Sequence, residues 1–117
     1  MKLHAVFNRD GGTFRTTDMD AYCDHALKTF RAAGHEIECE VVAGDKVVET
    51  MEKAASMPGV EGLIAGGGDG TISAAAGIAW KSGIVLGVVP AGTMNLFARS
   101  LKLPLDIWEV LDTLAEG

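Results

Sequence analysis

The sequence predicts an α/β domain: an open parallel sheet with helices on both faces. Segments typical of strands and of helices alternate along the 117 residues. Two strand segments, 63–65 and 84–89, are almost entirely apolar. Alternation of this kind builds a parallel sheet whose crossover helices cover both faces. Strands that are covered on both faces have continuous apolar runs, so we expect these two in the centre of the sheet.

The first half of the chain supplies two strands and two helices. Residues 3–7 are apolar and typical of a strand, and 18–33 have apolar residues at helical spacing before Gly34, a typical helix stop. In 37–41, apolar residues alternate with glutamates, as in an edge strand with one polar face. A second amphipathic helix is expected over 45–56.

The second half continues the alternation. The strand at 63–65 is followed by a small-residue helix at 72–80, the strand at 84–89 and a short helix around 96–101. A last helix is expected from Asp106. The length suits one domain with a single core.

Composition restricts the ligands that the domain can take. The formal net charge is −6, which excludes a nucleic-acid binder that needs a basic face. Residues 70–105 nevertheless contain no Asp or Glu but do contain Lys81, Arg99 and Lys102. This local positive charge favours a negatively charged ligand.

The remaining composition predicts a cytoplasmic protein. Cys23 and Cys39 have no metal-ligand or CxxC spacing and are expected to be buried free thiols of a reducing compartment. The N-terminus is too short and interrupted for a signal peptide, and no apolar run reaches membrane-span length. The three histidines are expected to be structural, and Trp80 and Trp108 to be packing residues.

The most informative motif is 66–71, Gly-Gly-Gly-Asp-Gly-Thr, between a strand and a helix. Backbone N–H groups and a helix N-terminus there can hold an anion such as phosphate, although a plain tight turn is the simpler alternative. The loops at 8–13 and 90–95 follow two other strands. All three should meet where the strands end, which is where ligands bind in such sheets. We expect Gly68 or Gly70 to need a backbone conformation closed to other residues.

Asp69 is the most informative single residue of this motif. A carboxylate in an anion-binding loop is explained by a cation such as Mg²⁺ on nucleotide phosphates, or by hydrogen bonds within its own turn. Thr71 either caps the following helix or contacts phosphate. The chain lacks a P-loop motif and the acidic residue expected about 20 positions after a dinucleotide fingerprint.

Together, 67–71 and Pro-Ala-Gly-Thr-Met-Asn-Leu-Phe-Ala-Arg at 90–99 resemble the catalytic domain of the diacylglycerol kinase family, which includes bacterial lipid kinases. The first motif is shared with NAD kinases and phosphofructokinases, whereas the second separates this family from them. The resemblance extends over essentially the whole chain and implies an NAD kinase/diacylglycerol kinase-like N-terminal domain.

The resemblance implies transfer of the γ-phosphoryl group of ATP to a lipid hydroxyl such as that of diacylglycerol, with Mg²⁺. Residues 1–117 would be the nucleotide-binding domain, and a β-rich second domain would supply lipid contacts and further carboxylates. Asp69 would be catalytic and act through the metal. The implied nucleotide-binding residues are Asn8, Gly11, Gly12, Gly67, Gly68, Gly70, Thr71, Gly92, Thr93 and Asn95.

The chain departs from the family pattern at several positions. Arg9 replaces a proline, Ser73 and Ala74 replace Asn and Glu, and Leu96 stands where Asp is common. These departures keep two alternatives open, an NAD kinase-like enzyme and a non-catalytic nucleotide-binding module. With the lipid domain absent, we expect no activity from this chain alone. Peripheral membrane contact is implied for the full-length protein, and self-association through an exposed apolar patch is expected.

Overall fold

The computed structural model describes residues 1–91 and 107–116. Its centre is a four-stranded sheet in which every neighbouring pair is parallel, in the order β2-β1-β3-β4. The strands are β1 (Lys2–Asn8), β2 (Glu36–Val42), β3 (Gly62–Gly67) and β4 (Val85–Pro90). The predicted parallel α/β fold is confirmed.

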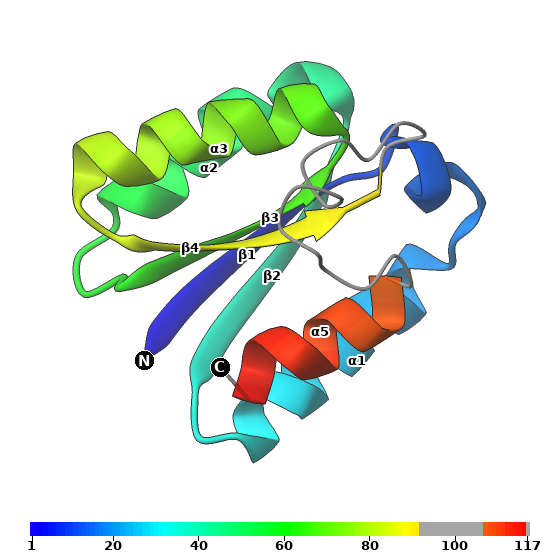
Figure 1. Ribbon diagram of the computed structural model, residues 1–117, viewed down its shortest axis with the longest axis horizontal. Helices are drawn as coiled ribbons and strands as arrows, with labels where there is room; N and C mark the ends of the chain where they lie inside the picture. The colour runs from blue at the N-terminus through cyan, green and yellow to red at the C-terminus, as the bar shows by residue number, and fades with distance from the viewer. Residues whose placement is uncertain (92–106, 117) are drawn as a thin grey trace.

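Helices cover both faces of this sheet, as predicted (Figure 1). On one face lie α1 (Met19–Ala32) and α5 (Ile107–Glu116); on the other lie α2 (Val47–Ser56) and α3 (Asp69–Ser82). Two 3-10 turns, η1 (Gly12–Thr16) and η2 (Gly44–Lys46), precede α1 and α2. In the part of the chain that the structure describes, no helix is both long and apolar enough to cross a membrane.

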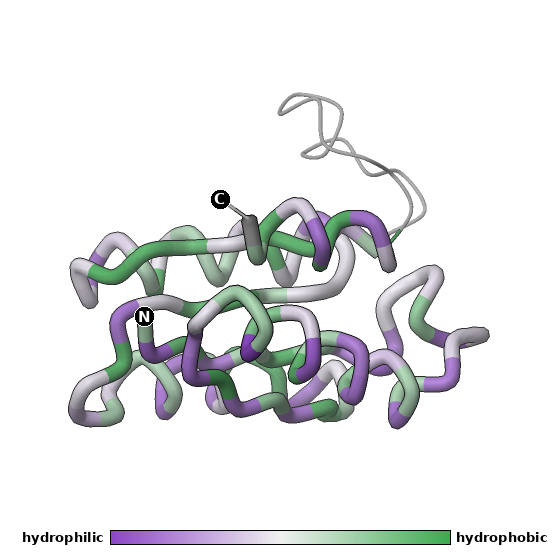
Figure 2. The backbone as a smooth tube through the Cα atoms, turned by 90° about the horizontal axis from the view of Figure 1, so that it is seen from below, coloured by the Kyte–Doolittle hydropathy of each residue, from purple (hydrophilic) through white to green (hydrophobic). Residues whose placement is uncertain are grey.

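The helices form where local chemistry predicts them. Asp18 caps α1, because its side chain accepts a hydrogen bond from the Ala21 N–H at 3.2 Å. Beyond the end of α1, Gly34 has φ +92°, a conformation that glycine adopts without strain. Hydrophobic and hydrophilic residues alternate along the helices in Figure 2, as expected of helices that pack on one side.

The two faces of the sheet have different cores. Under α1 and α5 the core is aromatic, with the rings of Phe7, Phe14 and Tyr22 at centroid distances of 5.1 to 5.7 Å. The Tyr22 hydroxyl donates to the Ile107 carbonyl at 2.7 Å and so ties α1 to α5. Under α2 and α3 the core consists of aliphatic and small residues, so these helices lie close to the sheet: Val6, Val47, Met51, Ala54, Leu63, Ala65 and Ala75.

Two sequence-based expectations are wrong. The central strands are β1 and β3, whereas β4 is the last strand of the described sheet and its Val85 is 53% exposed. The apolar sequence of β4 reflects cover by α3 and α5 rather than a central position. Trp80 is 87% exposed instead of packed, while Trp108 does pack on the Tyr22 ring, at 4.9 Å.

Candidate functional site

The first loop and the glycine loop meet at the carboxyl end of the sheet, as predicted, beside Pro90 and Ala91 at the end of β4. Phe7 pairs with Gly66, and Gly67 with Pro90, so β1, β3 and β4 end side by side. The Ala91 N–H donates to the Gly67 carbonyl at 2.8 Å, and the Ala91 carbonyl accepts from the Thr13 N–H at 2.7 Å. Main-chain hydrogen bonds therefore hold the first and third loops to the glycine loop.

Asn8 links the first loop to α3. Its side-chain oxygen accepts from the Asp10 N–H at 2.9 Å, which closes the turn, and its amide donates to the Thr71 hydroxyl at 3.3 Å. Its carbonyl accepts from the Gly11 N–H at 3.0 Å. Asn8 thus positions the first turn of α3 relative to the end of β1, although the sequence predicted it as a phosphate neighbour.

The glycines allow close approach between backbones. A Cβ on Gly67 would lie 2.8 Å from the Thr71 side chain, and one on Gly11 would lie 3.1 Å from the Gly67 Cα. Gly12 has φ +30°. The expected strain at Gly68 or Gly70 is absent: Gly68 is extended at φ −80°, and a Cβ on Gly70 would meet open space among the described residues. Close approach, not backbone strain at these two positions, is what requires glycine here.

The N-terminus of α3 lies in this group of loops. The helix begins at Asp69, three residues before the expected start at Ile72, with Gly68 as its N-cap. An acidic residue in the first turn stabilises a helix, which favours the early start. Thr71 therefore lies inside the first turn and does not cap the helix. Within the described ranges, the N–H groups of Asp69, Gly70 and Thr71 have no hydrogen-bond partner.

The Asp69 carboxylate has one buried oxygen atom at the N-terminus of α3. Its Oδ1 is buried and has no hydrogen-bond partner among the residues that the structure describes. Buried polar atoms are normally paired, and an exception often marks a missing ion or ligand. No cluster of three or more metal-ligating side chains exists in residues 1–91 and 107–116. Asp69 therefore fits a cation that phosphate groups also bind, since Mg²⁺ commonly uses one or two carboxylates plus phosphate oxygens.

Among the described residues, the predicted cation Lys81 does not contribute to this end of the sheet, whereas Arg9 and Arg15 lie near it. Lys81 lies in the last turn of α3, at the opposite end of the helix from Asp69. Arg9 is exposed on the first loop, and the Arg15 Nε donates to the Asp10 carbonyl at 2.9 Å. Arg99 and Lys102 lie outside the described residues. The local positive charge predicted from Arg99 and Lys102 therefore stays a prediction.

The second sequence motif, at 90–99, lies mostly outside the described residues. This includes the predicted residues Gly92, Thr93 and Asn95.

Sequence reasoning missed Asp10 of the first loop. Its Oδ2 accepts from the Gly44 N–H at 2.8 Å and ties the turn after β2 to the first loop. Its position two residues after Asn8, in a turn, was the available signal.

The family follows from comparison of the whole chain. Residues 2–117 match the model of the diacylglycerol kinase catalytic domain. The chain belongs to this family. Diacylglycerol kinase of Staphylococcus saprophyticus is 43% identical over 84 residues, which make up 68% of this chain and 28% of that protein. A Cronobacter sakazakii protein described as "Probable lipid kinase YegS-like" is 39% identical over 98 residues, 79% of this chain and 32% of the relative.

Solved structures of the diacylglycerol kinase family have the same fold. A diacylglycerol kinase of Bacillus anthracis superposes with a TM-score of 0.76 at 23% identity, over 98% of this chain and 42% of that one. A second structure from this bacterium, titled a putative diacylglycerol kinase, gives 0.71 at 25% identity. The chain spans about a third of the length of the curated relatives described above.

Proposed function

We propose that this kinase-family domain binds the phosphates of ATP together with Mg²⁺ at the carboxyl end of the sheet. The observation that carries the proposal is the buried Asp69 Oδ1, which has no hydrogen-bond partner among the described residues. The same holds for the N–H groups of Asp69, Gly70 and Thr71 in the first turn of α3. Main-chain N–H groups at a helix N-terminus accept phosphate oxygens. The match to the diacylglycerol kinase family supports a nucleotide rather than another anion.

The combination of donors and a carboxylate favours a metal-bound nucleotide. A bare phosphate would be attracted by the N–H groups and repelled by Asp69. Mg²⁺, when bound, supplies the charge that allows both to approach, and Asp69 would contribute one oxygen ligand. Gly67 and Gly11 let the first turn of α3 and the first loop pack closely against the end of β3, and Asn8 holds the helix end in place. The proposed phosphate-binding set is completed by Gly12, Gly68, Gly70 and Thr71, and by Gly92, Thr93 and Asn95 from the third loop.

We further propose that the phosphoryl group passes to a lipid hydroxyl. The relatives are named diacylglycerol kinase and lipid kinase, which supports this class of acceptor. Phosphoryl transfer depends on positioning the acceptor and stabilising charge. The described residues offer Asp69 for the charge but no evident lipid-binding wall, so we assign acceptor binding to a second, β-rich domain. By itself, the domain spanning 1–117 should bind nucleotide but should not transfer phosphate to a lipid.

Calorimetry with a matched pair of variants tests the phosphate site. Gly70 and Gly77 both lie on α3, seven residues apart and so on the same side, and a Cβ at either meets open space among the described residues. Gly70→Val should abolish ATP binding, because the side chain fills the space assigned to phosphate, whereas Gly77→Val should bind normally. Wild-type affinity should be tens to hundreds of micromolar, about 5–6 kcal/mol, and higher with Mg²⁺.

Three results would contradict the proposal. Absence of heat with millimolar ATP would exclude this site as a nucleotide site. Tighter binding of NAD than of ATP would favour an NAD kinase-like enzyme. Normal ATP binding by Gly70→Val would move the phosphates away from the N-terminus of α3. Equal thermal melting of the two valine variants confirms that neither result comes from unfolding.

A further inference from the structure

Two cysteines on different elements are in contact. Cys23 lies on α1 and Cys39 in the middle of β2, and their sulfur atoms are 2.6 Å apart. Both are free cysteines, as expected, but they are half-buried rather than buried. A disulfide bond measures about 2.05 Å, so the two sulfurs are already close to bonding distance. Their 16-residue separation in sequence gave no hint of this contact.

The surroundings make one thiol the better nucleophile. The hydrogen bond from Cys39 lowers the pKa of Cys23, against the opposing effects of burial and of the Asp20 and Asp24 carboxylates. The same hydrogen bond raises the pKa of Cys39, and burial raises it further. The thiolate is the form that attacks disulfides. Cys23 should therefore react first, with Cys39 beside it to complete an exchange.

Both cysteines are partly exposed, and one of them, Cys39, lines a surface hollow. Cys39 helps to line a surface hollow of about 440 Å³ that also includes Leu27, Arg31 and Met57. The neighbouring acidic residues, Asp20 and Asp24 beside Cys23 and Glu40 beside Cys39, repel an anionic reagent. A small neutral disulfide meets no such barrier.

We propose that Cys23 and Cys39 form a redox-reactive pair that low-molecular-weight disulfides oxidise to an intramolecular disulfide, clipping α1 to β2. The Cys23 thiolate attacks one sulfur of the small disulfide; that S–S bond breaks, and one thiolate leaves with the bonding electron pair. Cys39 then loses its proton and attacks the Cys23 sulfur, which displaces the second small thiolate. The two cysteine protons end on the two released thiols, and the protein loses two electrons to the reagent.

The clip would join two elements that lead to the first loop from either side. From Cys23 the chain runs back through α1 and η1 to residues 8–13, and from Cys39 it runs forward to Val42, whose carbonyl accepts from the Arg9 N–H at 3.0 Å. A covalent link here restricts the unfolded chain and should raise the melting temperature, by roughly 5–10 °C.

The reaction is tested with bis(2-hydroxyethyl) disulfide, a neutral reagent, on the wild-type chain and on Cys23→Ser and Cys39→Ser. Wild type should lose both titratable thiols and become lighter by two hydrogen atoms, with a higher melting temperature that dithiothreitol reverses. Each single variant should stop at a mixed disulfide with the reagent.

Several results would overturn the proposal. One is a wild-type chain that keeps both thiols under conditions that modify Cys39→Ser. Another is stable mixed disulfide on wild type at the level found in the single variants, since this would show that Cys39 cannot reach Cys23. Disulfide-linked dimers in place of an intramolecular bond, or an oxidised chain that melts no higher than the reduced one, would also exclude the clip.

Discussion

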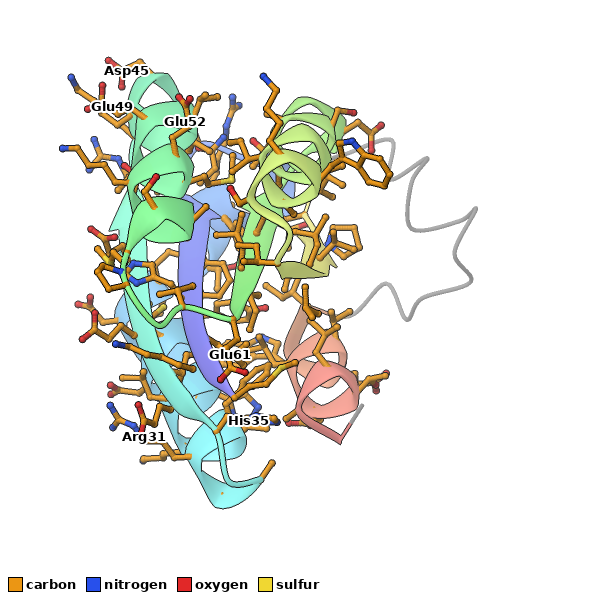
Figure 3. All side chains as sticks on the ribbon, turned by 90° about the vertical axis from the view of Figure 1, so that its left-hand side faces the viewer. Arg31, His35, Asp45, Glu49, Glu52 and Glu61 are labelled. Carbon is orange, nitrogen blue, oxygen red and sulfur yellow. The ribbon has the colours of Figure 1, made fainter. Side chains whose placement is uncertain are left out.

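The two ends of the sheet use their hydrogen-bonding groups differently. At the amino end, backbone groups are paired: the Lys2 N–H donates to the Glu61 carboxylate at 3.0 Å, and the Val85 N–H donates to the Glu61 carbonyl at 3.0 Å. Figure 3 views this end, with Arg31, His35 and Glu61 around the sheet; Arg31 and Glu61 are exposed and His35 is half-buried. At the carboxyl end, three N–H groups of α3 and one Asp69 oxygen have no partner among the described residues.

This difference shows which end can take a ligand. The amino end carries a hollow of about 540 Å³, but it is lined by charges of both signs, including Lys2, Arg31, Glu36 and Glu38. The positive charges there are balanced by negative ones, and the backbone N–H groups named above already have acceptors, so few groups remain to bind an anion. Unpaired buried groups cost free energy until something binds them. In this protein, unpaired hydrogen-bonding groups therefore indicate the ligand-binding end better than the volume of a hollow does.

The largest effect should come from adding a methyl group at one end of β3. In Gly66→Ala the new Cβ would lie 2.5 Å from the Phe7 ring and 2.9 Å from the Phe14 ring. Overpacking of these rings should lower the free energy of unfolding by about 3 kcal/mol. Gly62→Ala, at the amino end, meets the flexible Leu3 side-chain terminus at 2.6 Å and should cost less than about 1 kcal/mol. Urea denaturation compares the two; equal costs would show that the rings can move aside.

Asn8→Ala should have the next largest effect on stability. It removes the acceptor of the Asp10 N–H and the donor to the Thr71 hydroxyl. Two lost hydrogen bonds should cost about 2 kcal/mol, and a displaced α3 terminus should weaken ATP binding. Thr71→Ser keeps the hydroxyl and serves as the control. Unchanged ATP affinity in Asn8→Ala would show that Asn8 has no part in positioning the site.

The variant Asp69→Asn distinguishes the contribution of Mg²⁺ to ATP affinity from that of the phosphate contacts. The amide is a weaker ligand, so the gain in ATP affinity that Mg²⁺ provides should fall by about tenfold, or 1.4 kcal/mol. Affinity without Mg²⁺ should be equal or higher, because a charge that repels phosphate is gone. Calorimetry with and without Mg²⁺ gives both values. A variant that keeps the full Mg²⁺ effect would place the cation away from Asp69.

The smallest effect is expected at the amino end. His35→Ala removes a 3.4 Å contact of Nε2 with the Ala115 carbonyl and the ring contact with Phe30, at a cost of about 1 kcal/mol or less. ATP affinity should not change, because this side chain lies at the end opposite to the loops. Weaker ATP binding at equal stability would contradict the functional separation of the two ends.

Local sequence predicted most of the fold and where the site should lie. The strand and helix segments, the cap at Asp18, the stop at Gly34 and the edge position of β2 follow from side-chain periodicity and backbone preference, which act over a few residues. Parallel strands also had to bring the loops at 8–13 and 66–71 together, whatever the details of packing. The motifs at 67–71 and 90–99 carried the family resemblance.

Tertiary structure alone decided the rest. The terminal position of β4 does not follow from local pattern, because α3 and α5 cover its faces and favour an apolar sequence whether or not another strand lies beside it. The exposure of Trp80 depends on which elements pack against α3. The need for glycine at Gly67, the Asn8 link to Thr71 and the sulfur contact of Cys23 with Cys39 all arise between segments far apart in the chain. Such contacts depend on how closely packed elements approach one another, a property of the assembled core that no single stretch of sequence contains.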